Sequence, residues 1–254
     1  MPVLIALLLG LVIGSFLNAA IFRLHYGLPI WRGRSQCFTC RTELAWHDLL
    51  PVASFLILRG HCRTCDAEIH WQYPVVELVT ALLFVLALTL VPVGLPLGAS
   101  LAQLFFWWFI FAVFIFLFVY DARYGELPDQ ITLPTIIIAF IWMQLMHWGW
   151  KSSLIGGAIG GGFFLAQYLI SGGRWVGGGD IRLGFLIGLV VGWPLVAPSL
   201  IMAYVLGLVG VLILLALRRK TFGETVPFGT YLVTGALIAI FFSGPILKYI
   251  GRIF

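Results

Sequence analysis

Repeated apolar segments are the feature that most constrains how this chain can fold. Runs of close to twenty predominantly apolar residues recur along its whole length. A helix of about 20 such residues crosses the hydrocarbon core of a bilayer. The chain is 61% hydrophobic and only 10% charged, whereas a soluble domain has about a quarter charged residues. The sequence therefore predicts an all-α polytopic membrane protein.

About eight transmembrane helices are expected. The candidate spans are residues 3–22, 74–92, 101–120, 131–149, 153–171, 183–196, 197–217 and 229–247. The first apolar segment lacks a basic start and continues past the usual length of a signal-peptide core, so it is interpreted as a membrane helix. An even number of crossings places both termini on one side of the membrane.

The distribution of charge predicts which side that is. Twelve of the fifteen lysines and arginines fall in the odd-numbered loops, and the other three are Lys151, Lys248 and Arg252. Cytoplasmic loops are enriched in basic residues, so the odd-numbered loops are predicted to be cytoplasmic and both termini to lie outside. The net charge of +5 is then explained by topology, and no nucleic-acid partner is expected. The ten acidic residues lie on or next to the same side, which predicts that any chemistry occurs at the cytoplasmic face.

The first loop, residues 24–73, contains all four cysteines. Cys37 and Cys40 form one C-x-x-C pair and Cys62 and Cys65 form another, close to the spacing of a zinc ribbon. Four thiolates fill a tetrahedral site and leave no position for substrate, so a structural zinc is expected. The cytoplasm is reducing and disfavours disulfides, although four unrelated or redox-active thiols are the alternative. A small cytoplasmic zinc-ribbon-like domain is therefore predicted between the first two membrane helices.

Two aspartates at the cytoplasmic end of the membrane segments indicate a reaction centre. Asp121 ends the third span, where the helix dipole disfavours a negative charge, and its alternative role is an interfacial acid neutralised by Arg123 or another nearby base. Asp180 follows the glycine run Gly177, Gly178 and Gly179, and its alternative role is to cap the next helix. Two crossings separate these aspartates, so both return to the same membrane surface.

A pair of neighbouring carboxylates has a specific chemistry. Because two adjacent carboxylates do not both ionise easily, one keeps a proton while the other acts as a base. Such a pair activates water for attack on a peptide carbonyl, without a metal or a covalent intermediate. A third acid, Asp129, follows Pro128 and is expected to cap the fourth span. The glycines are expected to allow close backbone approach beside Asp121.

An ordered series of motifs resembles the bacterial prepilin peptidases, also called type IV leader peptidases, which are GxGD-type membrane aspartic proteases. The matching stretches are GSFLNAAIFRL at 14–24, the two C-x-x-C pairs, HDLLPVASFLILRG at 47–60, YPVVELVTALLF at 73–84, YDARYGELPDQITLP at 120–134, GGGDIRLG at 177–184 and VPFGTYLVTGA at 226–236. Within the last stretch, the sequence PFG at 227–229 is interpreted as a turn that opens the final span.

The resemblance implies an activity and its partners. It implies an inner-membrane enzyme that removes the leader from type IV prepilins and type II secretion pseudopilins. It also implies N-methylation of the new N-terminal residue, with S-adenosylmethionine as the methyl donor. The family's catalytic aspartates match Asp121 and Asp180, and Arg182 stands where the family usually has lysine. Asp129, Arg182 and the glycines 177–179 are expected to position the substrate, and Asp48 and Glu77 are candidates for attracting its basic leader.

The predicted organisation has three parts: a first transmembrane helix at 1–23, a four-cysteine zinc-binding loop at 24–73, and a membrane-embedded peptidase domain at 74–254. Two other classes of protein remain as alternatives. A proton-coupled transporter would place acids within the spans and show an internal repeat. A non-catalytic zinc-ribbon membrane adaptor would use the aspartates only as helix caps.

Overall fold

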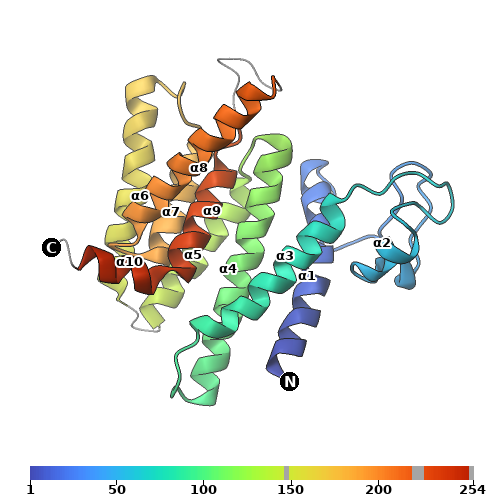
Figure 1. Cartoon of the computed structure of the whole chain (residues 1–254), viewed down its shortest axis with the longest axis horizontal. Helices are drawn as coiled ribbons and strands as arrows, with labels where there is room; N and C mark the ends of the chain where they lie inside the picture. The colour runs from blue at the N-terminus through green and yellow to red at the C-terminus, as the bar shows by residue number, and fades with distance from the viewer. Residues whose placement is uncertain (146–148, 219–225, 252–254) are drawn as a thin grey trace. The chain divides into compact units, whose positions relative to one another are not determined.

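The computed structural model describes residues 1–145, 149–218 and 226–251, and the regular secondary structure of these residues is helical apart from two isolated β-bridges (Figure 1). The elements in chain order are α1 (Pro2–His25), η1 (Trp46–Leu49), α2 (Ala53–Ile57), α3 (Gln72–Ala87), η2 (Leu88–Leu90), α4 (Leu97–Tyr124), α5 (Asp129–Leu145), α6 (Trp150–Ser171), α7 (Gly178–Val191), α8 (Val196–Ala216), α9 (Gly229–Phe241) and α10 (Ser243–Ile250). The chain forms two compact units, Met1–Phe116 and Leu117–Phe254.

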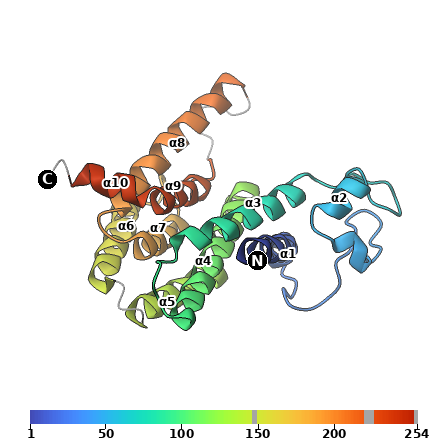
Figure 2. The same ribbon diagram turned by 60° about the horizontal axis from the view of Figure 1, so that its bottom comes forward.

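The first unit is built on the pair α1 and α3, which lie side by side in Figures 1 and 2. Glycines on α1 permit the close contact: a Cβ added at Gly14 would lie 2.6 Å from the Cα of Glu77. A buried asparagine on α1 also joins the two helices, because the Asn18 side-chain amide donates to the carbonyl of Tyr73 at 3.2 Å. Side-chain hydrogen bonds of this kind stabilise helix pairs in membranes.

The segment between α1 and α3 is attached to α3 by a buried acid. The Glu77 carboxylate accepts a hydrogen bond from the backbone N–H of Val52 at 2.7 Å. Val52 has a φ of 60°, an unusual conformation for a β-branched residue, and it directly precedes α2. Glu77 therefore holds the start of α2 against the membrane helix, and its carboxylate already has a partner within the chain.

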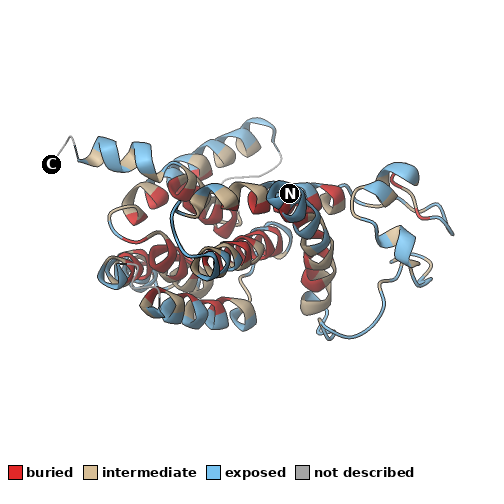
Figure 3. Ribbon diagram, turned by 90° about the horizontal axis from the view of Figure 1, so that it is seen from below, coloured by how far each residue is buried: buried red, intermediate tan, exposed pale blue. Residues whose placement is uncertain are grey.

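The second unit depends on close packing between α6 and α7 and between α8 and α9. Gly156 and Gly160 on α6 face Gly188 and Gly184 on α7, where an added Cβ would overlap the opposing backbone. Seen from below, the buried residues of this unit lie on the faces that its helices turn toward one another (Figure 3). The glycine contacts fix α7, the helix that begins with the GGGD sequence.

The helices agree well with the expected spans. Among the described residues, five helices are long and apolar enough to cross a membrane, namely α1, α3 with η2, α4, α6 and α8, and α9 with α10 would make a sixth. The all-helical membrane fold is thus confirmed, while the count of eight crossings stays a prediction. The basic residues Arg219, Lys220 and Arg252, used above to predict orientation, lie outside the described residues.

Two expected spans differ in detail. The span expected at 183–196 begins earlier, because α7 starts at Gly178 and ends at Val191. The span expected at 229–247 is broken, with α9 and α10 meeting at an angle of 79°. Pro245 lies in the first turn of α10, and it has no N–H to donate to the carbonyl of Phe241, so a straight helix cannot continue there.

Candidate functional site

Asp121 lies in the last turn of α4 and its carboxylate is held by the start of α9. The residue is only 4% exposed, and its Oδ2 accepts a hydrogen bond from the backbone N–H of Thr230 at 2.9 Å. Thr230 is the second residue of α9. The positive end of the α9 dipole and its free N–H groups therefore stabilise a carboxylate that its own helix end would disfavour.

Gly229 makes this contact possible. A Cβ added at position 229 would lie 2.9 Å from Asp121 Oδ2 and 3.0 Å from Cγ. The PFG sequence was interpreted only as a turn, and its position against Asp121 was missed. Within that sequence, Gly229 is the residue whose lack of a side chain makes room for the Asp121 carboxylate. The signal available in the sequence was a glycine at a helix start followed by a short polar residue.

Asp180 lies in the first turn of α7. Its Oδ2 accepts from the backbone N–H of Gly177 at 3.0 Å, which is the capping role that the sequence had left open. The same carboxylate lies close enough to Asp121 for the two groups to interact electrostatically. The fold thus brings Asp121 and Asp180 to the same end of one compact unit.

Leu127, in the loop between α4 and α5, fills the space between the glycines of the two helix starts. A Cβ at Gly179 would lie 2.9 Å from the Leu127 Cβ, and one at Gly229 would lie 3.2 Å from its Cδ2. The close approach expected at Gly179 is therefore present, but Gly179 contacts the side chain of Leu127 rather than Asp121. Gly178 has open space around its Cα, and a Cβ there would meet nothing within 4 Å.

Asp129 and Arg182 form an ion pair between the start of α5 and the first turns of α7. Asp129 is the first residue of α5 rather than the residue before it, and the N–H groups of Ile131 and Thr132 bond to the carbonyl of Pro128. Asp129 was expected to be the N-cap of this helix, but it lies one residue later, at the first helical position. The Arg182 guanidinium is directed to Asp129, and both side chains are partly exposed.

The four cysteines converge in the first unit. The Sγ atoms of Cys37, Cys40, Cys62 and Cys65 all lie within 4.8 Å of one another, and all four thiols are free. Zn–S bonds of about 2.3 Å in a tetrahedron separate the sulfurs by about 3.8 Å. The Sγ atoms of Cys37 and Cys65 are 3.8 Å apart. The predicted four-thiolate cluster fits a tetrahedral metal ion.

Local hydrogen bonds favour the thiolate forms of two of the four cysteines, whereas desolvation and the three neighbouring cysteines raise the pKa of Cys65 to about 12. The Thr42 hydroxyl and the Thr42 backbone N–H lower the pKa of Cys40 to about 6. Backbone N–H groups of Cys65 and Thr64 lower the pKa of Cys62. A cysteine with a lowered pKa binds metal more readily at neutral pH because less proton release is needed.

The cysteine cluster is built from two copies of one short motif, QCFTCRTE at 36–43 and HCRTCDAE at 61–68. Each copy closes with an isolated antiparallel bridge, between Gln36 and Glu43 and between His61 and Glu68. The residue after each second cysteine, Arg41 or Asp66, has a positive φ. Sequence reasoning used the cysteine spacing and missed this eight-residue duplication.

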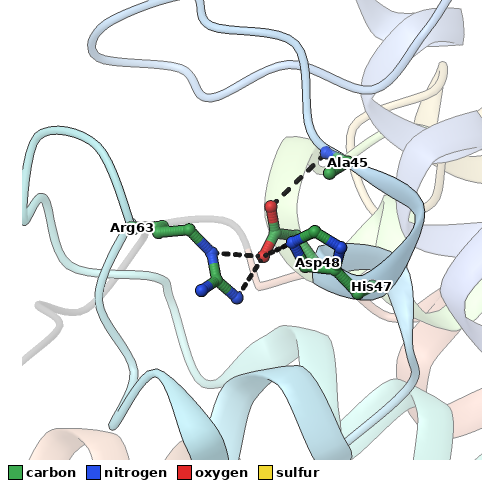
Figure 4. Close-up of polar contacts among 4 residues, drawn as sticks. All are labelled: Ala45, His47, Asp48 and Arg63. Carbon is green, nitrogen blue, oxygen red and sulfur yellow. Dashed lines mark hydrogen bonds and ion pairs between the residues drawn. The ribbon is translucent and has the colours of Figure 1, made fainter.

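The Asp48 carboxylate connects two parts of the loop that surrounds the cysteine cluster. Its Oδ1 accepts from Arg63 Nε at 2.9 Å and pairs with Nη2 at 2.8 Å, and Oδ2 accepts from the Ala45 N–H at 3.4 Å (Figure 4). His47 approaches the same carboxylate, with Nε2 at 3.6 Å from Oδ1. Arg63 lies inside the second cysteine motif, so this carboxylate is engaged within the loop. That contact disfavours the idea that Asp48 attracts a basic leader.

These features define a helical membrane protein with four cysteines placed close enough to hold a metal ion and with an aspartate pair. Comparison with known proteins gives the family. Residues 8–91 match the Bacterial Peptidase A24 N-terminal domain, and residues 108–213 match the Type IV leader peptidase family. The chain belongs to the type IV leader peptidase family.

The relatives cover almost the whole chain. This chain is 32% identical to the prepilin leader peptidase/N-methyltransferase of Dickeya chrysanthemi, and the matched region covers 91% of this chain and 89% of the relative. It is 31% identical to the protein of that name in Bacillus subtilis (strain 168), covering 96% of each. A relative so named in Burkholderia pseudomallei (strain K96243) is 32% identical, over 97% of this chain and 87% of its own length. No solved structure matches the chain. Neither a transporter nor an adaptor is supported by these matches.

Proposed function

We propose that this protein is a membrane aspartic endopeptidase that removes the leader peptide from type IV prepilins and type II secretion pseudopilins. Asp121 and Asp180 are the catalytic pair. The observation that carries this proposal is their arrangement: one carboxylate ends α4 against the N-terminus of α9, and the other begins α7 within electrostatic range of the first. The names of the relatives support the same substrate class.

The reaction needs one proton shared by two carboxylates. The ionised aspartate removes a proton from water, and the resulting hydroxide attacks the carbonyl carbon of the scissile peptide bond. The protonated aspartate gives its proton to the carbonyl oxygen. Collapse of the tetrahedral intermediate breaks the C–N bond, and a proton passes to the leaving amine. Because the carboxylates repel each other, holding a single proton between them is favoured.

Several residues around the pair are proposed to position it or the substrate. The N–H of Thr230 fixes the orientation of Asp121, and the N–H of Gly177 fixes that of Asp180. Gly178, with open space at its Cα, leaves room for an extended peptide along the glycine run 177–179. The Asp129 and Arg182 pair acts indirectly, by tying the first turns of α7 to the start of α5.

A structural zinc ion is proposed for the four-cysteine cluster. Cys37, Cys40, Cys62 and Cys65 hold it through their thiolates and leave no open coordination position. The ion stabilises residues 24–73, a segment too small to fold on a hydrophobic core alone. We retain the division into a helix at 1–23, this loop and a peptidase domain at 74–254 as the functional organisation.

N-methylation of the new N-terminal residue is part of the proposed function, because the relatives carry that activity in their names. The donor, S-adenosylmethionine, supplies an electrophilic methyl group when bound. Its binding requires partners for an ammonium, a carboxylate and a sulfonium. The groove beside Asp121 is lined by apolar side chains and hydroxyl groups and does not fit it, so no residues are assigned to this donor.

The proposed location is the bacterial inner membrane, with the aspartate pair at the cytoplasmic face and both termini outside. The basic residues of the odd-numbered loops support this orientation. The C-terminal end of α4 and the N-terminal ends of α7 and α9 all contribute to the site, as expected for helices that alternate in direction. A bond at that end of the helices is within reach of the pair.

Leader cleavage by the purified full-length protein tests the proposal. Asp121→Asn and Asp180→Asn are each expected to lower the cleavage rate of a prepilin about a hundred- to ten-thousandfold, the usual contribution of a general acid or base. Glu126→Gln, an exposed acid in the loop after α4, is the matched control and is expected to cleave normally. Near-normal cleavage by either aspartate variant, with folding intact, refutes the mechanism.

A further inference from the structure

The segment between α1 and α3 exposes large apolar side chains that neither the cysteine cluster nor the aspartate pair uses. Leu56 and Ile57, at the end of α2, are 67% and 72% exposed, and Trp31 is 84% exposed. Apolar groups gathered on one exposed segment mark an interaction surface. The place of these side chains relative to the membrane helices indicates which partner covers them.

The chain after α1 turns back along that helix. The ring of Trp31 stacks on that of Phe16, with centroids 5.2 Å apart and 26° between the planes, and Arg23 holds the turn by donating to the carbonyl of Ile30 at 2.9 Å. Phe16 is the fifteenth residue of α1, whereas about 20 helical residues cross the hydrocarbon core of a bilayer. Phe16 therefore lies within the span, and Trp31 lies beside it at the depth of the bilayer.

The start of α2 is held against the same pair of helices. The Val52 N–H directly before α2 donates to the carboxylate of Glu77, five residues after α3 begins at Gln72. The backbone of Glu77 packs against Gly14, which is also within the span of α1. Figure 1 accordingly shows α2 to the side of α1 and α3, at the level of these helices rather than beyond their ends.

A surface beside two membrane helices faces lipid. Close to this point α3 exposes Val75 and Leu78, as a helix surrounded by acyl chains does. Arg59 follows α2 directly after Leu58 and is exposed. A short segment with apolar side chains on one part and a cation beside them is typical of interfacial membrane binding, and tryptophan is enriched at this depth. Charge and position thus both favour lipid as the partner.

We propose that the end of α2, together with Trp31, inserts into the bilayer leaflet at this end of α1 and α3, so that the cysteine-bearing segment is docked on the membrane surface. Leu56 and Ile57 enter the boundary between headgroups and acyl chains, and Arg59 contacts an anionic headgroup. The membrane that already surrounds α1 and α3 is the partner, and no second protein is required. Docking of this kind is independent of the proposed peptidase reaction, so failure of one leaves the other unaffected.

The depth of position 57 in a bilayer tests the proposal. The full-length protein is placed in vesicles of phosphatidylethanolamine and phosphatidylglycerol, with a spin label on p-acetylphenylalanine at position 57, which leaves the thiols unmodified. Position 64 is the matched control, because Thr64 is an exposed polar residue of the second cysteine motif. The ratio of label collisions with oxygen, which concentrates in lipid, to collisions with a water-soluble nickel chelate is expected to be severalfold higher at 57 than at 64. Equal ratios in the folded protein would overturn the proposal. A label at 57 that neither reagent reaches would indicate a protein contact and would overturn it as well.

The role of charge is tested with the same label. In vesicles that contain phosphatidylglycerol, Arg59→Gln is expected to lower the ratio at position 57, whereas in phosphatidylcholine vesicles it is expected to change the ratio little. Arg41→Gln, at an exposed arginine of the first cysteine motif, is the matched control and is expected to behave as the unsubstituted protein does in both. A decrease caused by both substitutions, or by neither, would overturn the contact assigned to Arg59.

Discussion

At the scale of single residues, the site depends on backbone donors and missing side chains. Asp121 and Asp180 each accept from a backbone N–H at the start of a helix, α9 for the former and α7 for the latter. Gly229 provides the space for the contact at Asp121, and Gly179 makes room for the Leu127 side chain. Helix N-termini are natural partners for carboxylates because their first N–H groups are otherwise unpaired.

This arrangement predicts the effect of a single methyl group. In Gly229→Ala the added Cβ lies 2.9 Å from Asp121 Oδ2, so the carboxylate must shift by several tenths of an ångström or more. A displacement of about 1 Å at a reacting group costs as much as a hundredfold in rate. The kcat for leader cleavage is therefore expected to fall tenfold or more, with little change in thermal stability.

Gly162→Ala provides the control for that measurement. Gly162 lies within α6 and a Cβ there would meet nothing within 4 Å. Alanine is favoured over glycine in a helix by about 1 kcal/mol, so this variant is expected to be as stable as the wild type or more so, and fully active. Gly229→Ala with normal kcat would mean that the Asp121 position is less constrained than the structure indicates.

At the scale of elements, the sequence predicts which segments are helices better than it predicts where each helix begins and ends. Apolar runs located every helix of the membrane part, because a bilayer imposes length and composition strongly. The pairing of Asp129 with Arg182, the start of α7 at Gly178 and the bend before α10 depend on contacts between residues distant in sequence or on one proline. The aspartates themselves stood out because charge is rare in such a chain, whereas the roles of Gly229 and Thr230 required the three-dimensional contact.

The ion pair between α5 and α7 predicts a charge-reversal result. Asp129→Arg and Arg182→Asp each place like charges together and are expected to reduce leader cleavage severalfold. The double variant restores an opposite-charge pair and is expected to recover much of that loss, with a coupling energy of about 0.2–1 kcal/mol for a partly exposed pair. The measurement is a double-mutant cycle on cleavage rate, with Glu126→Arg as the unpaired control. Simple additivity of the two losses would show that the pair does not connect the helices functionally.

At the scale of the whole molecule, the four-cysteine cluster and the aspartate pair belong to different compact units. The four cysteines lie in Met1–Phe116, and both aspartates lie in Leu117–Phe254. Each unit is held together by its own contacts, through glycine packing between α1 and α3 in one and between α6 and α7 in the other. Loss of the metal is therefore expected to act locally.

Metal removal tests this separation. The wild type is expected to carry about one zinc per chain by elemental analysis, and the double variant Cys37→Ser, Cys62→Ser to carry essentially none, since two thiolates are lost from a four-ligand site. Hydrogen exchange is expected to show lost protection at residues 36–68 and unchanged protection in the buried part of α7, residues 183–190. A wild type without metal, or exchange that spreads into α7 after metal loss, would contradict this account.

The hydrogen bond from position 230 to Asp121 has a consequence for how this enzyme is explored genetically. The donor is the main-chain N–H of Thr230, which every amino acid except proline supplies. Thr230→Ala in an alanine scan would remove the hydroxyl's own bond to the Pro227 carbonyl and leave the main-chain contact in place, so the scan would not reveal this contact. An inhibitor that binds this N–H would keep its contact when the side chain changes. The peptidase therefore cannot readily become resistant through a side-chain substitution at position 230.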